Sequence, residues 1–369
     1  MLARLLECAG IESVVLESRS RDYVERRIRA GVLEQGTAEL IEEAGVGERM
    51  AREGIVHSGI ELQFDGERHR IPLSELAGGR TIVIYGQTEV VKDLIAARLA
   101  ASLPLHFQVD DVSVHDFDGS SPFVRFTHDG EPHELSCDVI AGCDGFHGVC
   151  RPAIATTLRT FERDYPFGWL GILAAVAPSS DELVYAHHER GFALLSLRSP
   201  ELCRLYLQCR PDENVDEWPD ERIWEELQRR VALPGWELAE GQVLEKGVTG
   251  MRSFVAEPMQ HGHLFLAGDA AHIVPPTGAK GLNLAIADVA VLAAGLIDRY
   301  RTGSGDRLAA YSATCLQRVW RAEHFAWWMT MMLHRQGEDP FDLQLQLEQL
   351  RYVVASKAAA TTLAENYVG

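Results

Sequence analysis

The pattern of apolar and polar positions changes twice along the chain, which predicts three regions of different structure. In the first region, helical spacing of apolar residues alternates with short apolar runs, as in a domain with a parallel sheet. From Ala279 onward the pattern is helical. Between them, apolar and polar residues alternate, which predicts short antiparallel strands at Trp169–Ala175, Leu183–His187, Phe192–Arg198 and Cys203–Gln208.

The first region begins with the second half of a dinucleotide-binding βαβ unit. A helix over 2–9 ends at Gly10, and a strand at Ile11–Leu16 leads to Glu17. The first strand of such a unit and its Gly-x-Gly-x-x-Gly turn would precede the helix. Because Met1 already lies in the helix, we expect that about 15 residues of such a unit are missing before it.

Further elements follow in the first region. We expect a helix at 37–53, a hairpin of Ile55–Phe64 and Arg68–Ile71 turning at Asp65-Gly66, a strand at Thr81–Tyr85, a helix at Thr88–Leu103 and a strand at Cys137–Ala141. A second strand of the parallel type, His263–Ala267, comes after the antiparallel region. The nucleotide-binding domain is therefore predicted to be discontinuous.

Composition excludes several classes of partner. The chain has 35 Lys and Arg against 54 Asp and Glu, a formal net charge of −19, which repels nucleic acids and anionic membranes. We see no apolar run as long as a membrane span. The seven cysteines form no Cys-x-x-Cys pair, which indicates free thiols in a reducing cytoplasm, and the paired histidines lack partners for a metal site.

The most specific chemical signal lies at 264–283. An apolar strand delivers Asp269 at its carboxyl end, where an acid can bind sugar hydroxyls, although a Gly-Asp pair alone is equally consistent with a loop cap. Pro275 and Pro276 follow, and then glycines that let a ligand approach the backbone. The next helix points its free N–H groups at that ligand, which favours an anionic ring such as a reduced flavin.

Two other groups carry weaker signals. Arg26, Arg27 and Arg29 can bind a pyrophosphate or nicotinamide nucleotide, or can be a solvated helix face. Asp144-Gly145 can belong to a phosphate loop or to a structural turn.

Polar residues share one face of the antiparallel sheet. They can bind a carboxylate and surround an aromatic ring, but from the pattern alone a polar outer face is the more common interpretation. These residues are Tyr185, Ser196, Arg198, Arg204 and Tyr206.

Several stretches together resemble the 4-hydroxybenzoate 3-monooxygenase family of class A flavoprotein aromatic hydroxylases. The resemblance runs from Met1 to Gly369. It rests on the sequences that begin Arg27-Ile-Arg-Ala-Gly, Tyr85-Gly-Gln-Thr-Glu, Cys143-Asp-Gly-Phe-His, Tyr165-Pro-Phe-Gly-Trp and Glu365-Asn-Tyr-Val-Gly, and on the stretch from Gly268-Asp269 to Asn283.

The resemblance implies an α/β fold: a discontinuous, Rossmann-like FAD-binding domain at 1–160 interrupted by a β hairpin, an inserted, mainly antiparallel substrate-binding domain at 161–262, and a helical C-terminal region at 263–369. It also implies site residues. FAD would contact Glu17, Arg27, Ile28, Arg29, Ala30, Gly31, Val32, Gln87, Asp269, Gly281, Leu282 and Asn283. The substrate would contact Tyr185, Ser196, Leu197, Arg198, Tyr206 and Pro276. Tyr185, Tyr367, His57 and Pro276 would have catalytic roles, and Tyr23, Arg29, His147 and Arg252 would dock NAD(P)H.

The reaction that the resemblance implies is hydroxylation of 4-hydroxybenzoate at C3 by O2 and NAD(P)H, through a flavin hydroperoxide, in a cytoplasmic homodimer. Ser18 stands where arginine is usual, so NADPH and NADH remain alternatives, with Arg19 or Arg21 as substitutes for that arginine. Because the expected Gly-rich turn is absent, a flavin-free remnant that binds aromatic acids is the alternative function.

Overall fold

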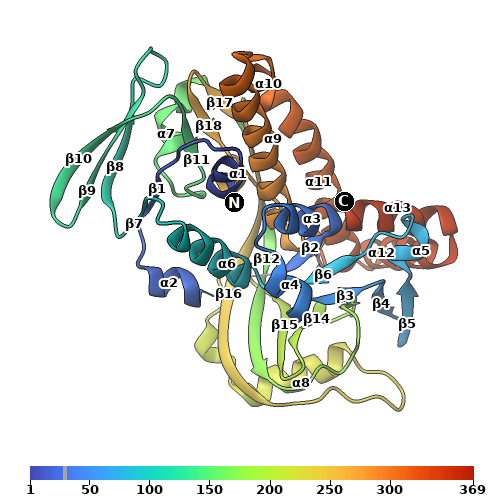
Figure 1. Cartoon of the computed structure of the whole chain (residues 1–369). Coiled ribbons are helices and arrows are strands. Elements are labelled where there is room, and N and C mark those ends of the chain that lie inside the picture. The colour runs from blue at the N-terminus through green and yellow to red at the C-terminus, as the bar shows by residue number, and fades with distance from the viewer. Residues whose placement is uncertain (28–30) are drawn as a thin grey trace.

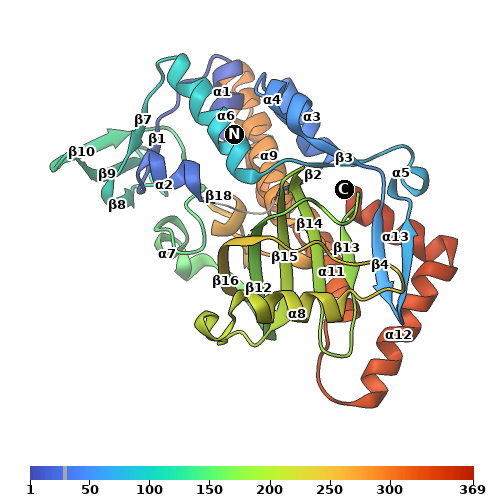
Figure 2. The same cartoon turned by 90° about the horizontal axis from the view of Figure 1, so that it is seen from below.

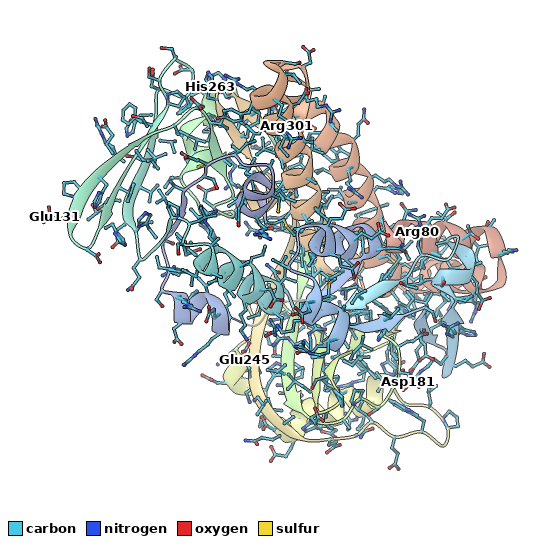
Figure 3. All side chains as sticks on the ribbon, in the orientation of Figure 1. Arg80, Glu131, Asp181, Glu245, His263 and Arg301 are labelled. Atoms are coloured by element: carbon cyan, nitrogen blue, oxygen red, sulfur yellow. The ribbon has the colours of Figure 1, made fainter. Side chains whose placement is uncertain are left out.

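The computed structural model describes residues 1–27 and 31–369 (Figure 1). Ile28, Arg29 and Ala30, which the resemblance places at FAD, lie outside the described residues. Charged side chains such as Glu131, Asp181 and Glu245 project from the periphery (Figure 3).

Two small sheets each contain a parallel pair of strands. In one, β1 (Val15–Glu17) pairs with β7 (Leu105–Phe107). In the other, β11 (Ile140–Gly142) pairs with β18 (Leu264–Leu266), which joins segments on either side of the antiparallel region. This pairing confirms the discontinuous arrangement. The strand predicted from Ile11 is shorter than expected, because only its last residues find a parallel partner at β7.

The prediction of a single helix over 37–53 is wrong. The segment forms two helices, α3 (Gln35–Glu43) and α4 (Glu48–Glu53). Gly45 between them has a φ of 69°, which a helix cannot contain. The apolar faces of α3 and α4 pack on β2 (Val32–Glu34) and β6 (Ile82–Ile84), which pair with β3 (Ile55–His57) in the order β2-β6-β3.

The predicted hairpin is also shorter than expected. β4 (Ile60–Phe64) and β5 (Glu67–Ile71) turn at Asp65 and Gly66, whose φ values of 51° and 74° fit the left-handed turn predicted from Asp-Gly. Residues 55–57 instead form β3 in the other sheet.

The hairpin is part of an eight-stranded sheet, in the order β19-β16-β12-β15-β14-β13-β4-β5. Its pairings are antiparallel except for β13 with β4, which is parallel. The remaining strands are β12 (Arg159–Ala175), β13 (Val184–Ala186), β14 (Ala193–Ser199), β15 (Leu202–Cys209), β16 (Gln242–Glu257) and β19 (His272–Ile273).

Helices cover both faces of this sheet (Figure 2). One face packs on α8 (Asp220–Arg230). The other packs on α11 (Tyr311–Leu333), α12 (Pro340–Ala355) and α13 (Lys357–Val368). The second face carries Tyr185 and Ser196, so the interpretation of a polar outer face is wrong: the C-terminal helices bury it.

Helix α9 (Gly281–Thr302) is long and apolar enough to cross a membrane by length and composition, contrary to the expectation of no such run. In the described structure 56% of its apolar window is buried. Leu284, Leu292 and Leu296 pack in the core beside residues of α1 (Leu2–Cys8) and α11, which is the environment of a core helix.

The other elements complete the connections. They are α2 (Arg21–Arg26), α5 (Leu73–Leu76), α6 (Gln87–Ala100), β8 (Asp110–His115), β9 (Phe123–His128), β10 (Glu131–Ser136), α7 (Cys150–Ala153), β17 (Gln260–His261), α10 (Asp306–Ala309) and the short 3₁₀ turns η1 (Ala155–Thr157), η2 (Val215–Glu217), η3 (Gly268–Ala270) and η4 (Pro276–Gly278). All seven cysteines lie within the described residues and are free, as expected.

Truncating the core between the sheet and α13 should destabilise the protein strongly. Leu363 is fully buried, so we expect Leu363→Ala to lower the free energy of unfolding by about 2–5 kcal/mol. Leu244→Ala is the matched control, because that side chain is 51% exposed and its loss should cost less than about 0.5 kcal/mol. Urea unfolding measures both, and equal values would contradict the packing.

Candidate active site

Strand register aligns the predicted substrate residues on the covered sheet face. Leu194 is opposite both Tyr185 on β13 and Tyr206 on β15, and Ser196 is opposite Arg204. Directly paired residues point to the same side of a sheet, so these side chains share one face. Tyr185 and Ser196 are only 2% and 3% exposed, so a ligand here would be enclosed by protein.

Arg198 is the charged group of this face. Its Nη1 donates to Ser196 Oγ at 2.8 Å and to the carbonyl oxygen of Leu197 at 3.1 Å. Its Nε is buried and has no partner among the described residues. Burial lowers the pKa of Arg198, because the charged form loses its hydration. Among the described residues Arg198 forms no ion pair with an acidic side chain, so its charge is not neutralised there.

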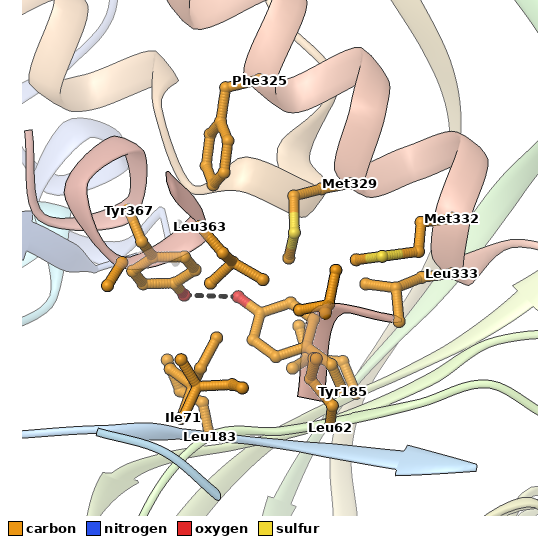
Figure 4. Packing of buried hydrophobic residues seen from close by; sticks show 14 of the residues in the cluster. Leu62, Ile71, Leu183, Tyr185, Phe325, Met329, Met332, Leu333, Leu363 and Tyr367 are labelled. Atoms are coloured by element: carbon orange, nitrogen blue, oxygen red, sulfur yellow. Dashed lines mark hydrogen bonds between the residues drawn. The ribbon is translucent and has the colours of Figure 1, made fainter. Parts of the chain in front are cut away.

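Two tyrosines meet between the sheet and α13. Tyr185 Oη lies 2.5 Å from Tyr367 Oη on α13, and both rings are surrounded by apolar residues such as Leu363 and Met329 (Figure 4). Burial raises the pKa of both hydroxyls, so both are neutral near pH 7 and each can donate as well as accept.

His57 is the third group of the predicted proton path. Its ring is 2% exposed, and neither ring nitrogen has a hydrogen-bond partner among the described residues. Burial lowers its pKa, so it is neutral near pH 7.

The proline- and glycine-rich loop adopts the shape that its sequence predicts. Pro276 begins η4, and Ala279 follows with a φ of 53°, which turns the chain into α9. Asn283 fixes this start: its Oδ1 accepts from the Glu34 N–H at 2.9 Å, and its Nδ2 donates to the carbonyl oxygens of Val32 and Ala279. A Cβ added at Gly281 would meet open space, so a ligand can approach the backbone there.

The loop is joined to the two tyrosines through Lys280, which sequence reasoning missed. Lys280 Nζ donates to Glu34 Oε1 at 2.6 Å and to the carbonyl oxygen of Tyr367 at 3.0 Å. The hydroxyl of Tyr367 in turn reaches Tyr185. The start of α9 and Tyr185 on the sheet are therefore connected through a single residue of α13.

The other residues expected at FAD lie at the ends of several strands and helices. Glu17 ends β1, and its Oε1 accepts from the Arg19 N–H at 2.7 Å. Gln87 begins α6, and Thr88 Oγ1 donates to the carbonyl oxygen of Arg27 at 2.6 Å. A Cβ at Gly31 would lie 2.5 Å from Gly86 Cα, so two backbones meet there. Val32 begins β2, Leu282 packs beside the core of α3 and α4, and Asp269 is exposed on η3.

Two of the residues expected to dock NAD(P)H flank Phe146. His147 is exposed, with its ring centroid 5.1 Å from that of Phe146, and the Arg252 guanidinium carbon lies 5.1 Å from the same centroid. Tyr23 is 45% exposed on α2, between the guanidinium groups of Arg19 and Arg27. Arg29, the fourth such residue, lies outside the described residues.

Comparisons with known proteins show the family to which the chain belongs. A family model described as an FAD binding domain matches residues 1–326. The p-hydroxybenzoate hydroxylase of Acinetobacter baylyi is 51% identical over 372 residues, which cover all of this chain and 92% of that protein. The chain belongs to the p-hydroxybenzoate hydroxylase family. It is therefore a member of the flavoprotein hydroxylases, and its α/β fold with antiparallel sheet and C-terminal helices is that of the class.

More distant proteins share the fold. The solved structure of p-nitrophenol 4-monooxygenase from Pseudomonas putida has a TM-score of 0.86 and 19% identity, covering 100% of this chain and 95% of that one. A 3-(3-hydroxy-phenyl)propionate/3-hydroxycinnamic acid hydroxylase of Mycobacterium avium is 26% identical over 328 residues, which are 83% of this chain and 54% of that protein.

The rings of Trp169, Phe192 and His334 form an aromatic wall behind Tyr206, which the sequence analysis did not predict. The ring of Trp169 on β12 lies 4.7 Å from that of Tyr206, and the rings of Phe192 and His334 stack beside it. Trp169 belongs to the stretch Tyr-Pro-Phe-Gly-Trp that carried the resemblance, and that was its only signal. His334, at the end of α11, had none, because 165 residues separate it from Trp169.

The two hydroxyls of the tyrosine pair should stabilise the folded protein jointly. Tyr367→Phe leaves the buried hydroxyl of Tyr185 without a partner, so we expect a loss of about 1–3 kcal/mol in the free energy of unfolding. In the ligand-free protein, Tyr185→Phe combined with Tyr367→Phe should cost less than the sum of the single changes. Additive losses in urea unfolding would show that the two hydroxyls do not interact.

The buried imidazole of His334 should make stability depend on pH. Burial lowers its pKa to about 3 from the usual 6.5, so between these values the unfolded chain binds a proton that the folded protein does not. Stability should therefore fall as the pH drops below about 6.5, with His334 contributing about 1.4 kcal/mol per pH unit until its folded pKa is reached. His334→Gln should remove this contribution to the pH dependence of stability. Urea unfolding measured from about pH 4 to about pH 8 checks this.

Proposed function

We propose that this protein is an FAD-dependent monooxygenase that uses NAD(P)H and O2 to hydroxylate 4-hydroxybenzoate at C3, giving 3,4-dihydroxybenzoate. One observation carries the proposal: a buried arginine without an acidic partner faces a buried tyrosine pair, and the loop that starts α9 lies at the far end of that pair. The 51% identity to a p-hydroxybenzoate hydroxylase over the whole chain supports the substrate and the reaction.

The substrate carboxylate is assigned to Arg198. A guanidinium presents several N–H donors in a planar fork that matches a carboxylate, and Nε of Arg198 is free for one of these bonds. Ser196 Oγ and the carbonyl of Leu197 already hold Nη1, which fixes the direction of the fork. The anion would also remove the energetic cost of a buried, unpaired charge.

The phenol end of the substrate is assigned to Tyr185 and Pro276. A phenolate ring is more easily attacked by an electrophilic oxygen than a phenol, so the site must take up the phenol proton. The neutral hydroxyl of Tyr185 can donate to a phenolate and can pass a proton to Tyr367 Oη at 2.5 Å. No direct hydrogen bond connects Tyr367 to His57 among the described residues, so the last transfer would pass through water. The carbonyl of Pro276 is assigned to the same end of the ring.

The residues that remain fit FAD. The acid at the end of β1, the close backbones at Gly31, the open backbone at Gly281 and the first backbone N–H groups of α9 are the groups that a dinucleotide requires. Glu17, Arg27, Val32, Gln87, Asp269 and Leu282 complete the assignment. Bound FAD, once reduced, supplies the oxygen-activating chemistry. The apolar residues around the tyrosines exclude water from the reacting ring.

Tyr23, His147 and Arg252 are assigned to NAD(P)H. The choice of coenzyme stays open: Arg21 is paired with Glu25, whereas Arg19 lies over Tyr23. Comparing kcat/KM for NADPH and NADH in the wild type and in Arg19→Ala decides it. A homodimer and a cytoplasmic location remain predictions.

Conversion of 4-hydroxybenzoate tests the proposal directly. Protein supplied with FAD, NADPH or NADH, and air should form 3,4-dihydroxybenzoate, measured by chromatography. The 2- and 3-hydroxy isomers place the phenol away from Tyr185 and should give little product. A protein that carries flavin but leaves 4-hydroxybenzoate unchanged would exclude this substrate.

Replacing Arg198 by lysine should weaken substrate binding even though the charge is kept. A lysine cannot form the paired bonds of a guanidinium, so we expect the dissociation constant for 4-hydroxybenzoate to rise roughly 10- to 100-fold. Arg125→Lys, at an exposed position on β9, is the matched control and should bind normally. An unchanged dissociation constant in Arg198→Lys, measured from the flavin spectrum, would refute the carboxylate assignment.

A further inference from the structure

The hydrogen-bond partners of the two ring nitrogens of His334 allow only one protonation state of the ring. Nδ1 lies 3.1 Å from the carbonyl oxygen of Thr330, which can only accept, so Nδ1 carries the proton. Nε2 lies 2.7 Å from Trp169 Nε1, which can only donate, so Nε2 is the bare acceptor. The ring is fully buried. A protonated His334 would set two donors against each other, so the geometry itself holds this imidazole neutral.

The ring of His334 also packs against Phe192 and Trp169, which contact the two tyrosines of the substrate face. Its ring centroid lies 4.3 Å from that of Phe192 and 5.8 Å from that of Trp169, in near-parallel stacks. Trp169 in turn lies against Tyr206, and Phe192 lies 6.2 Å from Tyr185. Tyr206 and Tyr185 are the two aromatic residues assigned to the substrate ring, so His334 stands directly behind the groups that contact it.

The same network continues to the loop on the other side of the site. The hydroxyl oxygens of Thr330 and Thr277 are 2.9 Å apart, and Thr277 follows Pro276 in η4. Both threonines are completely buried. Hydrogen bonds therefore run from η4 through Thr330 and His334 to the indole of Trp169. This is a second connection between the two sides of the site, independent of Lys280 and Tyr367.

We propose that His334 is a positioning residue for hydroxylation: it holds the Trp169 indole against Tyr206 and fixes the distance from the substrate ring to the loop at Pro276. This role rests on the proposed function. An acceptor is required at position 334, because otherwise the buried indole N–H loses its partner and the wall behind Tyr206 can shift. A displacement of about 1 Å at the reacting ring is enough to lower the yield of hydroxylation greatly.

A double-mutant cycle tests the role in the FAD-loaded enzyme. His334→Leu should raise KM for 4-hydroxybenzoate roughly tenfold, and more of the NAD(P)H consumed should yield hydrogen peroxide instead of product. Trp169→Phe removes the indole N–H and keeps an aromatic ring. In the Trp169→Phe background, His334→Leu should have little further effect, because the bond through which it acts is already gone. Equal effects of His334→Leu in both backgrounds would overturn the proposal.

A conservative variant separates positioning from general packing. The amide of glutamine can accept from the indole and donate to the Thr330 carbonyl, so His334→Gln should restore most of the lost coupling between NAD(P)H oxidation and product. If His334→Leu fails to fold, His334→Asn, which is too short to reach both partners, takes its place in the cycle. A glutamine variant no better than leucine or asparagine would contradict the acceptor role.

The indole N–H resonance of Trp169 gives a readout that does not depend on activity. It is identified by its absence in Trp169→Phe, and it should shift in His334→Leu and stay constant from about pH 5 to 8 in the wild type, because His334 remains neutral. A resonance that does not respond to His334→Leu would overturn the positioning role of His334 but would leave the proposed function standing. Wild-type enzyme that leaves 4-hydroxybenzoate unchanged would instead contradict the proposed function.

Discussion

Burial of a polar sheet face beneath the C-terminal helices is the constraint on which the site depends. A polar group taken out of water must find a partner, and most on this face do: Ser196 with Arg198, Tyr185 with Tyr367, and Trp169 with His334. An exception on this face is Nε of Arg198, which is buried without a partner among the described residues. His57, on β3 of another sheet, also has two buried ring nitrogens without partners there. The proposed chemistry assigns an anion to Arg198 and the departing proton to His57.

The charge distribution follows the same logic. The protein carries a net charge of −19, yet two of the groups buried at its site are cationic. Lys280 is neutralised by Glu34 at 2.6 Å, so it fixes structure and holds the start of α9. Arg198 has no such acid among the described residues, and the proposed function pairs it with the substrate carboxylate. The negative exterior does not prevent an aromatic acid from binding, because short-range bonds to a desolvated guanidinium outweigh screened repulsion from distant surface charges.

Two separate chains of contacts hold the loop of η4 and the sheet at a fixed distance. One runs through Lys280 and α13 to Tyr185, and the other runs through Thr330 and His334 to Trp169. Both pass through the C-terminal helices, which contribute hydrogen-bonding groups from Thr330 to Tyr367. These helices therefore complete the site as well as the core, and changes within them should reach the chemistry without touching a ligand.

Local sequence determined the elements and much of the site. Alternation predicted the strands from Trp169 to Gln208, and Asp65-Gly66 predicted a hairpin turn with left-handed backbone. The proline and glycine spacing located the start of α9. These features were predictable because turn chemistry and strand periodicity act over a few residues. The prediction of one helix over 37–53 was wrong, because the two glycines in this segment are compatible with a helix and also with a break. Packing of α3 and α4 on β2 and β6 decided in favour of the break.

Only the tertiary structure decided which side of the sheet is buried. The alternation of Ser196, Arg198 and Tyr206 is the same for a surface and for a site, and helices more than 100 residues later resolve it by covering that face. The pairs Lys280–Glu34 and Trp169–His334 were likewise invisible, because hydrogen bonds between residues 246 and 165 positions apart leave no periodic trace in either segment. Sequence specified the groups, and long-range packing gave them their partners.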